Sequence, residues 1–192
     1  ADVITEGEGG GLDTVLLKAQ GKYVLAANVE RVLVQGRQAV DVEGNEGANV
    51  LAGNAGSNRL WGMGGDDVLS GGLRGLDFLY GGAGNDVYYV RHAQTMVVEV
   101  TPEGTDAGGR DTVIAGVENY RLGVNVEDLV LRAGIVTGWG NELGNRLEGN
   151  FLDNRLWGWG GDDVLAGGVG SDELVGGKGS DWFLLDALGR GV

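Results

Sequence analysis

Aspartate or asparagine recurs at a nine-residue spacing along two stretches of this chain, each time closing a glycine-rich hexapeptide. GWGGDDVLA at 158–166 shows the pattern, and GMGGDDVLS at 62–70 nearly repeats it. A carboxylate held in a glycine turn can bind a cation together with the carbonyl oxygens that the turn exposes. The same acids could instead be surface charge or paired catalytic carboxylates. The arrangement of the repeats has to decide between these three kinds of chemistry.

Ten such units form two arrays. The first array contains units 44–52, 53–61, 62–70, 71–80 and 81–89, and the second contains 140–148, 149–157, 158–166, 167–175 and 176–184. Each unit starts with glycine and has Leu, Tyr or Phe at its eighth position, allowing for one extra residue in 71–80. The last three residues suit a short strand whose middle side chain points inward, and the glycines suit a sharp turn. Two units would then make one coil, and stacked coils would share a narrow apolar core.

The sixth residue of each unit carries the candidate chemistry. These residues are Asn49, Asn58, Asp67, Asp77 and Asp86 in the first array and Asn145, Asn154, Asp163, Asp172 and Asp181 in the second. Alternate units share a side of a two-sided coil, so we expect Asp67 beside Asp86 and Asp163 beside Asp181. Strands about 4.8 Å apart would bring these like charges close, which is unfavourable unless a cation lies between them.

The available ligands favour calcium among the metals. Carboxylate and carbonyl oxygens suit Ca²⁺, whereas Mg²⁺ demands rigid octahedral geometry and keeps its waters. Zinc fits worse, because the chain has one histidine and no cysteine. The sequence therefore predicts several calcium sites formed by turns two units apart.

Composition excludes several other classes of function. Lys+Arg number 14 against Asp+Glu 28, a formal charge of −14, which argues against nucleic acid and anionic membrane surfaces. No apolar run is long enough to span a membrane, and no basic and then apolar leader opens the sequence, so we expect neither a membrane span nor an N-terminal signal peptide. Forty glycines and one proline need a geometric reason, which the turns supply.

The chain is a tandem duplication. NRLWGMGGDDVLSGG at 58–72 matches NRLWGWGGDDVLAGG at 154–168, and YVLAANVERVLV at 23–34 matches YRLGVNVEDLVL at 120–131. We predict one module at 1–91, with lead-in 1–43 and nonapeptides 44–89, and a second at 92–192, with lead-in 92–139 and nonapeptides 140–184. Apolar, β-branched runs in the lead-ins predict longer strands at 14–17, 29–34, 97–100 and 126–131. Helix signals are nearly absent, with at most a helical turn near Asn28 and Asn125.

The units resemble the RTX (repeats-in-toxin) nonapeptide G-G-x-G-x-D-x-hydrophobic-x. GGVGSDELV and GGKGSDWFL fit this pattern fully, and GGAGNDVYY fits it nearly, with Tyr in the hydrophobic place. The resemblance implies an all-β fold, a right-handed parallel β-roll in two tandem RTX modules, each with a strand-rich lead-in. It also implies several Ca²⁺ ions bound between turns two units apart.

In that family one turn supplies the carbonyls of its second and fourth residues and its Asp, and the other supplies the carbonyls of its first and third residues and its Asp. Carried over, the ligand sets are Met63, Gly65 and Asp67 with Gly81, Ala83 and Asp86; Trp159, Gly161 and Asp163 with Gly176, Lys178 and Asp181; and Asn150, Leu152 and Asn154 with Gly167, Val169 and Asp172. Turns with neutral Asn should bind calcium weakly or stack as an uncharged amide ladder. The extra residue in 71–80 disfavours a site at Asn58 and Asp77, so we expect fewer ions in the first half.

A second kind of candidate site lies in the lead-ins. TDAGGRDT at 105–112 resembles a calcium loop that precedes the arrays of RTX proteases, which implies Asp106, Gly108 and Asp111 as ligands. The copy of this loop in the first lead-in implies Glu8, Gly10 and Asp13. The alternative for both segments is a plain acidic turn.

Catalytic motifs are missing from the sequence. His92 is the only histidine, and we expect it on a surface linker between the halves. There is no G-x-S-x-G elbow and no H-E-x-x-H zinc motif. We therefore expect no enzyme activity in this segment, although a parent protein could carry a catalytic domain elsewhere.

Trp61, Trp139, Trp157 and Trp159 leave two interpretations open. Trp61 and Trp157 fall at the outward ninth position of a unit, where they could stack on sugar rings or pack on the rest of the chain. The leading hypothesis is a calcium-binding RTX segment of a larger secreted protein, which folds into a β-roll when it meets Ca²⁺ outside the cell. The alternative is an adhesin or polysaccharide-binding accessory module that uses these aromatic residues.

Overall fold

The computed structural model describes residues 3–18, 20–101 and 104–185. Every regular element in this part of the chain is a β-strand, and none of it forms a helix that could cross a membrane. The chain divides into two compact units, Ala1–Thr112 and Val113–Val192. The all-β fold expected from the sequence is confirmed.

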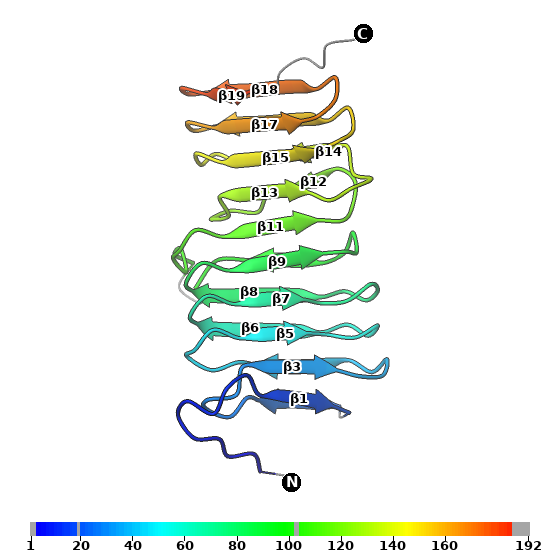
Figure 1. The fold of residues 1–192 in the computed structure, drawn as a ribbon, viewed down its shortest axis with the longest axis vertical. Helices are drawn as coiled ribbons and strands as arrows, with labels where there is room; N and C mark the ends of the chain where they lie inside the picture. Colours follow the sequence, from blue (N-terminus) through cyan, green and yellow to red (C-terminus); the bar gives the residue numbers. More distant parts are fainter. Residues whose placement is uncertain (1–2, 19, 102–103, 186–192) are drawn as a thin grey trace. The chain divides into compact units, whose positions relative to one another are not determined.

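The first unit is a parallel β-solenoid, seen in Figure 1 as stacked rungs from blue to green. Its strands are β1 (Thr14–Leu17), β2 (Gly21–Val24), β3 (Arg31–Val34), β4 (Val40–Glu43), β5 (Val50–Ala52), β6 (Arg59–Gly64), β7 (Val68–Ser70), β8 (Phe78–Ala83), β9 (Val87–Val90) and β10 (Met96–Val98). Odd-numbered strands pair in the order β1-β3-β5-β7-β9, and even-numbered strands pair in the order β10-β8-β6-β4-β2. Successive strands therefore alternate between two parallel sheets, which is the topology of a coil with two sides.

The second unit repeats this arrangement. Its strands are β11 (Thr112–Ala115), which starts at the last residue of the first unit, β12 (Tyr120–Arg121), β13 (Asp128–Leu131), β14 (Thr137–Trp139), β15 (Arg146–Asn150), β16 (Arg155–Gly160), β17 (Val164–Gly168), β18 (Glu173–Lys178) and β19 (Trp182–Leu184). They form one sheet in the order β11-β13-β15-β17-β19 and another in the order β12-β14-β16-β18. Each unit is thus a parallel β-roll.

The eighth residue is buried and forms the core in all nonapeptides except the last two units of the second array, where it is half-buried or exposed. In the first unit Leu51, Leu69 and Tyr88 are partners in register on β5, β7 and β9, and each is at most 1% exposed. In the second unit Leu147 pairs with Leu165 in the same way. The strand flanks are half-buried, as in the pattern of β7. Since successive side chains of a strand point to opposite faces, the nonapeptide phase fixes which residue is buried, and this prediction is confirmed.

The lead-in strands follow the expectation in part. β1 covers 14–17 as predicted, whereas β3 and β13 begin two residues later than predicted and β10 covers 96–98 instead of 97–100. These strands pair in parallel with the strands of the neighbouring coils, and none of them is longer than β6, which has six residues. At most a helical turn was expected near Asn28 and Asn125, and none forms there. Both residues have φ of 59°, and this left-handed conformation suits a tight turn rather than a helix.

The compact units and the predicted sequence modules have different boundaries. Residues 92–112 belong to the first unit, because β10 pairs with β8 and the backbone of Thr112 donates to the carbonyl of Asp86 at 2.8 Å. The end of a duplicated sequence and the end of a compact body are separate properties. The module boundary at 91 therefore remains a prediction about the duplication.

Candidate metal centre

The first glycine of a unit leaves room for the aspartate at its sixth position. A Cβ on Gly62 would overlap Asp67 Oδ2 and the carbonyl oxygen of Gly81, which belongs to the neighbouring turn on the same side. Later in the same turn Gly65 has φ of 87°, a conformation that glycine adopts without steric cost. The glycines therefore allow both a sharp bend and a close approach of oxygen atoms.

Each buried aspartate uses its two carboxylate oxygens differently. Asp86 Oδ1 accepts a hydrogen bond from the backbone of Asp67 at 2.8 Å, and Asp181 Oδ1 accepts one from Asp163 at 3.0 Å. In the same way, Asp77 Oδ1 accepts a hydrogen bond from the backbone of Asn58, and Asp172 Oδ1 accepts one from the backbone of Asn154. Asp67 bonds to Asn49 and Asp163 to Asn145 in the same way, so the structure brings together all six pairs of sixth-position residues that lie two units apart.

The other carboxylate oxygen has no such bond. Oδ2 is buried and has no hydrogen-bond partner among the described residues in Asp67, Asp77, Asp86 and Asp163. A buried polar atom without a partner is costly, and each such atom in a native protein calls for a ligand or a proton. These atoms are the first sign of a bound cation.

One carbonyl oxygen of the neighbouring turn lies beside Asp67 Oδ2. It is that of Gly81, because both atoms lie where a Cβ on Gly62 would be. The carbonyl oxygens of Met63 and Gly65 lie against Gly82 and Gly84 of the next turn, where a Cβ would overlap them. Ala83, the remaining predicted ligand, pairs in register with Gly64 at the end of β8. The turns therefore bring a carbonyl oxygen to the carboxylate and pack two others closely against the neighbouring backbone.

The second unit repeats this geometry. The carbonyl oxygens of Trp159 and Gly161 lie against the next turn, at Gly177 and Gly179. A Cβ on Gly158 would overlap Asp163 Oδ2 and the carbonyl oxygen of Gly176. Lys178 pairs in register with Gly160, and its side chain is exposed. The third predicted set is similar, because the carbonyls of Asn150 and Leu152 lie against Gly168 and Gly170, and the Gly167 carbonyl and Asn154 Oδ1 lie where a Cβ on Gly149 would be. In this set Asp172 is half-buried and Val169 is exposed.

Burial changes the acidity of the turn aspartates. The pKa of Asp67 is raised to about 8. Burial is the main cause, a hydrogen bond from Asn49 lowers the pKa, and the charges of Asp86 and Asp66 raise it. Burial likewise raises the pKa of Asp86 and of Asp163 to about 6. Burial is also the main cause of the raised pKa of Asp77, and His92 is a smaller influence that lowers it. Such carboxyl groups are poor free anions and are stabilised by a proton or by a cation.

The neighbouring fifth-position acids are placed differently. Asp66 and Asp162 are exposed. Asp66 Oδ1 accepts a hydrogen bond from the backbone of Asn85, and Asp162 Oδ1 accepts one from Ser180, both at 2.8 Å. These acids link turns on the outside of the coil, while the sixth-position acids face the carbonyls.

The amide group of Asn58 lies between two turns of the first unit and donates hydrogen bonds to both. Asn58 Nδ2 donates to the carbonyls of Gly56 and Gly71, at 2.8 and 3.1 Å, and to Asp77 Oδ1 at 3.1 Å. The extra residue of unit 71–80 falls between Gly72 and Gly75. The carbonyl oxygens of Asn54 and Gly56 lie so close to these two glycines that a Cβ on either would overlap one of them. The uncharged amide ladder is therefore the arrangement that the structure shows at this turn.

Asparagine at the second position of a unit also donates hydrogen bonds to backbone carbonyls, in four turns, and the sequence analysis did not predict this role. Units that begin Gly-Asn direct this Asn to the turn two units earlier, where its Nδ2 donates to two carbonyls. The pairs are Asn45 with Ala26 and Val29, Asn54 with Gln35 and Gln38, Asn141 with Gly123 and Val126, and Asn150 with Arg132 and Ile135. Asn at the second position, together with Asn at the sixth, was the signal available in the sequence. These turns satisfy their carbonyls without metal.

The lead-in loops bury their acids to different extents. Asp111 is 1% exposed, whereas Asp106 is exposed and accepts a hydrogen bond from Gly108 within its own loop. In the first lead-in Glu8 and Gly10 are exposed, and Asp13 is half-buried. Burial and then the charges of Glu6 and Glu30 raise the pKa of Asp13. The charges of Asp111 and Asp106 both act on Glu99, and both predicted ligand sets remain predictions.

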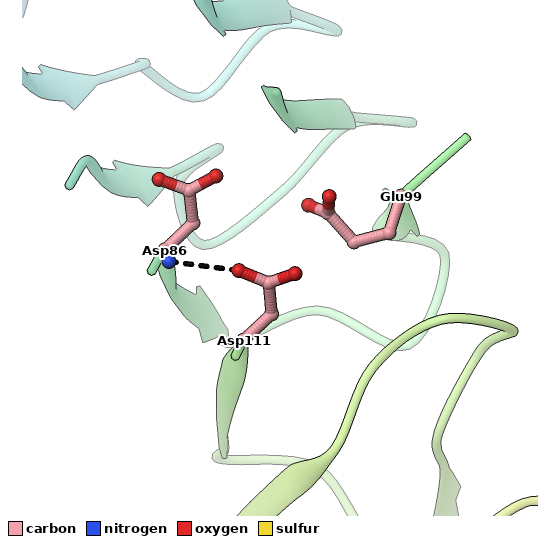
Figure 2. Close-up of side chains that lie close together, drawn as sticks. All are labelled: Asp86, Glu99 and Asp111. Atoms are coloured by element: carbon pink, nitrogen blue, oxygen red, sulfur yellow. Dashed lines mark hydrogen bonds between the residues drawn. The ribbon is translucent and has the colours of Figure 1, made fainter. Parts of the chain in front are cut away.

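Glu99 is a buried acid that the sequence analysis also missed. It lies with Asp86 and Asp111 in the one group of three metal-binding side chains found among the described residues (Figure 2). No repeat marks Glu99, since it follows β10 in the lead-in. Only the apolar strand before it could have indicated its position.

An all-oxygen donor set fits calcium at the Asp-bearing turns. Carboxylate Oδ2 atoms without partners, carbonyls from two turns and glycines in place of side chains are what a hard cation with several oxygen ligands needs. A parallel β-roll with such turns defines a calcium-binding repeat protein. Comparison with protein families matches residues 43–73, 72–90, 139–174 and 167–187 to the RTX calcium-binding nonapeptide repeat, in four copies. These matches cover half of the chain, which therefore belongs to the RTX calcium-binding repeat family. A search of curated proteins found no matching relative.

Proposed function

We propose that this chain is a calcium-dependent folding module of a larger secreted protein. It binds several Ca²⁺ ions between its Asp-bearing turns and becomes compact when calcium is present outside the cell. The observation that carries the proposal is the set of fully buried aspartates whose Oδ2 atoms have no partner in the described residues. Because only the folded turns assemble the ligands, the free energy of calcium binding adds to the free energy of folding.

The ligand sets proposed for the turns are those carried over from the family pattern. Asp67 and Asp86 with carbonyls of Met63, Gly65 and Gly81 have the best support, and the equivalent set around Asp163 has the same contacts. The set with Asn154 and Asp172 has one carboxylate fewer, so we expect weaker binding there. Asn58 already donates to carbonyls near Asp77, so we expect fewer ions in the nonapeptide turns of the first unit than in those of the second.

Circular dichroism of metal-depleted protein tests the folding role. We expect little β-structure after calcium is removed with a chelating resin, and a cooperative gain of β-structure on addition of Ca²⁺ in the millimolar range. Magnesium at the same concentration is the control, and it should act weakly because it retains its waters. A spectrum that is identical with and without calcium would refute the folding role, and metal analysis of the purified chain gives the number of ions.

Secretion is a separate part of the proposal. RTX repeats are typical of secreted proteins, and an acidic chain without cysteine can remain unfolded in a calcium-poor cell without forming disulfides. The test is export of the full-length parent protein from bacteria with and without a type I secretion system. Equal amounts in the medium of both strains would contradict this route.

The proposed role is structural rather than catalytic. His92 is half-buried in the turn between β9 and β10, instead of exposed on a linker, and it lies near the carboxyl of Asp77. Its neighbourhood resembles a structural contact more than a nucleophile and its base. Any enzyme activity of the parent protein would belong to another domain.

A polysaccharide partner is the alternative hypothesis, and the aromatic residues bear on it. The rings of Trp61 and Tyr80 stack at 5.3 Å, and those of Trp139 and Trp157 stack at the same distance. The guanidinium of Arg121 lies 3.5 Å from the ring centre of Trp159. These contacts occupy ring faces that a sugar would need, so they favour packing. Tryptophan fluorescence with a panel of glycans tests the alternative, and quenching by one glycan would revive it.

A further inference from the structure

Three buried carboxylates meet where the first array ends (Figure 2). Asp86 precedes β9, Glu99 follows β10 and Asp111 precedes β11, so three separate segments contribute. One oxygen atom of each lies within 4.8 Å of the others, and each side chain is at most 1% exposed. Oxygen ligands of one Ca²⁺ lie about 2.3–2.6 Å from the ion, so this spacing allows a single ion to contact all three.

A tyrosine hydroxyl gives a second, independent sign of a ligand. Tyr88 occupies an inward position that leucine holds in most units, and it is fully buried. Its hydroxyl oxygen and Asp86 Oδ2 both lie where a Cβ on Gly81 would be, and neither has a hydrogen-bond partner among the described residues. The backbone of Gly81 also donates a hydrogen bond to Glu99. Oxygen atoms from Tyr88, Asp86 and Glu99 therefore gather around the same glycine.

Hydrogen bonds hold the segment before β11 in place. Asp111 Oδ1 accepts from the backbone of Asp86 at 2.8 Å, which continues the ladder of aspartates after a step of 25 residues instead of 18 or 19. The backbone of Arg110 donates to Asn85 Oδ1 at 2.9 Å, and that of Gly84 donates to the carbonyl of Gly108 at 3.3 Å. The cluster is thus positioned by contacts that do not depend on its own charge.

We propose that Asp86, Glu99 and Asp111 bind one calcium ion at a site next to the turn site of Asp67 and Asp86, with which it shares Asp86. The inference rests on the proposed function, since it takes calcium to be the ion that this chain binds. Three carboxylates face the ion here, compared with two in a turn site, and affinity for calcium rises with ligand charge. We expect this site to fill at lower calcium than the turn sites and to fasten residues 92–111 to the last turn of the first array.

The surroundings of Glu99 agree with this assignment. Burial, followed by the charges of Asp111 and Asp86, raises the pKa of Glu99 to about 9. Three carboxylates this close repel one another when all are ionised, and a bound cation offsets that repulsion. The close spacing of the three groups carries the assignment.

The test is calcium titration of the full chain in competition with a fluorescent chelator, for wild type, Glu99→Gln and Asp106→Asn. Glu99→Gln removes one charge from the cluster and keeps the size of the side chain. We expect it to lose the tightest ion, or to bind that ion at least tenfold more weakly. Asp106→Asn is the matched control, because Asp106 is exposed in the same lead-in and lies outside the cluster. The charge of Asp106 acts on Glu99 from outside the cluster, so Asp106→Asn should change the affinity of the tightest ion far less than Glu99→Gln does and should leave the other affinities unchanged.

Two results would overturn the inference and leave the proposed function intact. One is equal binding by wild type and Glu99→Gln, and the other is loss of an ion in Asp106→Asn alone. If wild type binds no calcium, the proposed function fails as well. Should Glu99→Gln not fold even in saturating calcium, Glu99→Asp keeps the charge and shortens the reach. It should fold and bind the tightest ion at least tenfold more weakly, and an unchanged affinity would refute the site.

Discussion

At the scale of single residues, the turn aspartate combines two tasks that are usually separate. Asp86 Oδ1 fixes the stacking of coils through the backbone of Asp67, and Asp86 Oδ2 remains without a partner among the described residues. Stacking and cation binding are therefore coupled through one side chain. Asparagine can keep the first task, because its amide oxygen also accepts a hydrogen bond, but it loses the negative charge.

Replacing one turn aspartate should separate these tasks. We expect Asp163→Asn to keep the hydrogen bond to Asn145 but to bind one calcium ion fewer, with the calcium midpoint of folding raised about tenfold, which is roughly 1.4 kcal/mol. Asp162→Asn is the control, because Asp162 is exposed and its Oδ1 bonds to the outer ladder. Calorimetric titration gives ion numbers and affinities. Equal effects of the two variants would rule out Asp163 as a ligand.

A second residue-scale prediction concerns the first glycine of the turn. Gly62→Ala would place a Cβ on Asp67 Oδ2 and on the carbonyl oxygen of Gly81. We expect a loss of about 1–3 kcal/mol in the free energy of unfolding with calcium present, from overpacking, and weaker binding of one ion. Gly7→Ala is the control, because nothing lies within 4 Å of its added Cβ. Urea denaturation with calcium measures both variants, and a harmless Gly62→Ala would contradict the crowded turn.

At the scale of the repeated element, the structure contains two kinds of turn. Turns such as 62–67 present aspartate to carbonyl oxygens, whereas turns such as 140–145 place asparagine amides on the carbonyls of an earlier turn. Amide N–H donors satisfy the backbone carbonyls in the second kind, and we propose that a cation does so in the first. The coil geometry is common to both.

Loss of an amide turn should be independent of calcium. Asn141→Ala would leave the carbonyl of Gly123 without its donor, and that of Val126 would keep only the longer bond from Asn145 Nδ2, at 3.2 Å. We expect this to cost about 1–3 kcal/mol of unfolding free energy at high and at low calcium. Glu142→Ala, at the exposed neighbouring position, is the control and should change little. Thermal unfolding at two calcium concentrations measures this. A loss that disappears in saturating calcium would mean that metal, and not the amide, supports this turn.

The repeat explains why much of this was predictable from the sequence. Period nine fixes the inward residue and the sixth-position residue, so the core at Leu69 and the pair of Asp67 with Asp86 followed from spacing. The lead-ins have no fixed period, so their strand ends were harder to place, and β3 and β13 begin two residues later than predicted. Glu99 reaches Asp111 across twelve positions of irregular chain, and only tertiary folding brings them together. The role of Asn141 was missed because its partners lie in a lead-in without repeats.

At the scale of the whole molecule, net charge and buried acids act in the same direction. The chain has a formal charge of −14, and several of its carboxyls are buried where ionisation is unfavourable. Self-repulsion and desolvation both oppose the compact state when neither calcium nor protons neutralise these groups. Stability should therefore depend on both ligands.

The pH dependence should change sign with calcium. The pKa of Asp67 is raised to about 8 in the folded state from an ordinary value of 3.8, so folding favours its protonated form. Without calcium, this contribution is complete below pH 4 and is lost as the pH rises toward 8. With saturating calcium the carboxylates must be ionised, so stability should rise over the same interval.

Thermal unfolding between pH 4.5 and 8, with metal-depleted protein and with excess calcium, measures both slopes. Asp67→Asn should flatten both curves, and Asp66→Asn, at an exposed position, serves as the control. Parallel curves with and without calcium would contradict the competition between protons and the ion.

The amide-filled turns have a practical meaning for protein engineering. Gly-Asn at the start of a unit and Asn at its sixth position keep the backbone path of a Gly-Gly and Asp unit, as Asn141 and Asn145 show. The residues at the second and sixth positions of each repeat would then determine whether a coil needs metal. A designer could tune the calcium threshold of a switchable biomaterial by choosing how many coils carry Asn at these positions, with no change to the apolar interior.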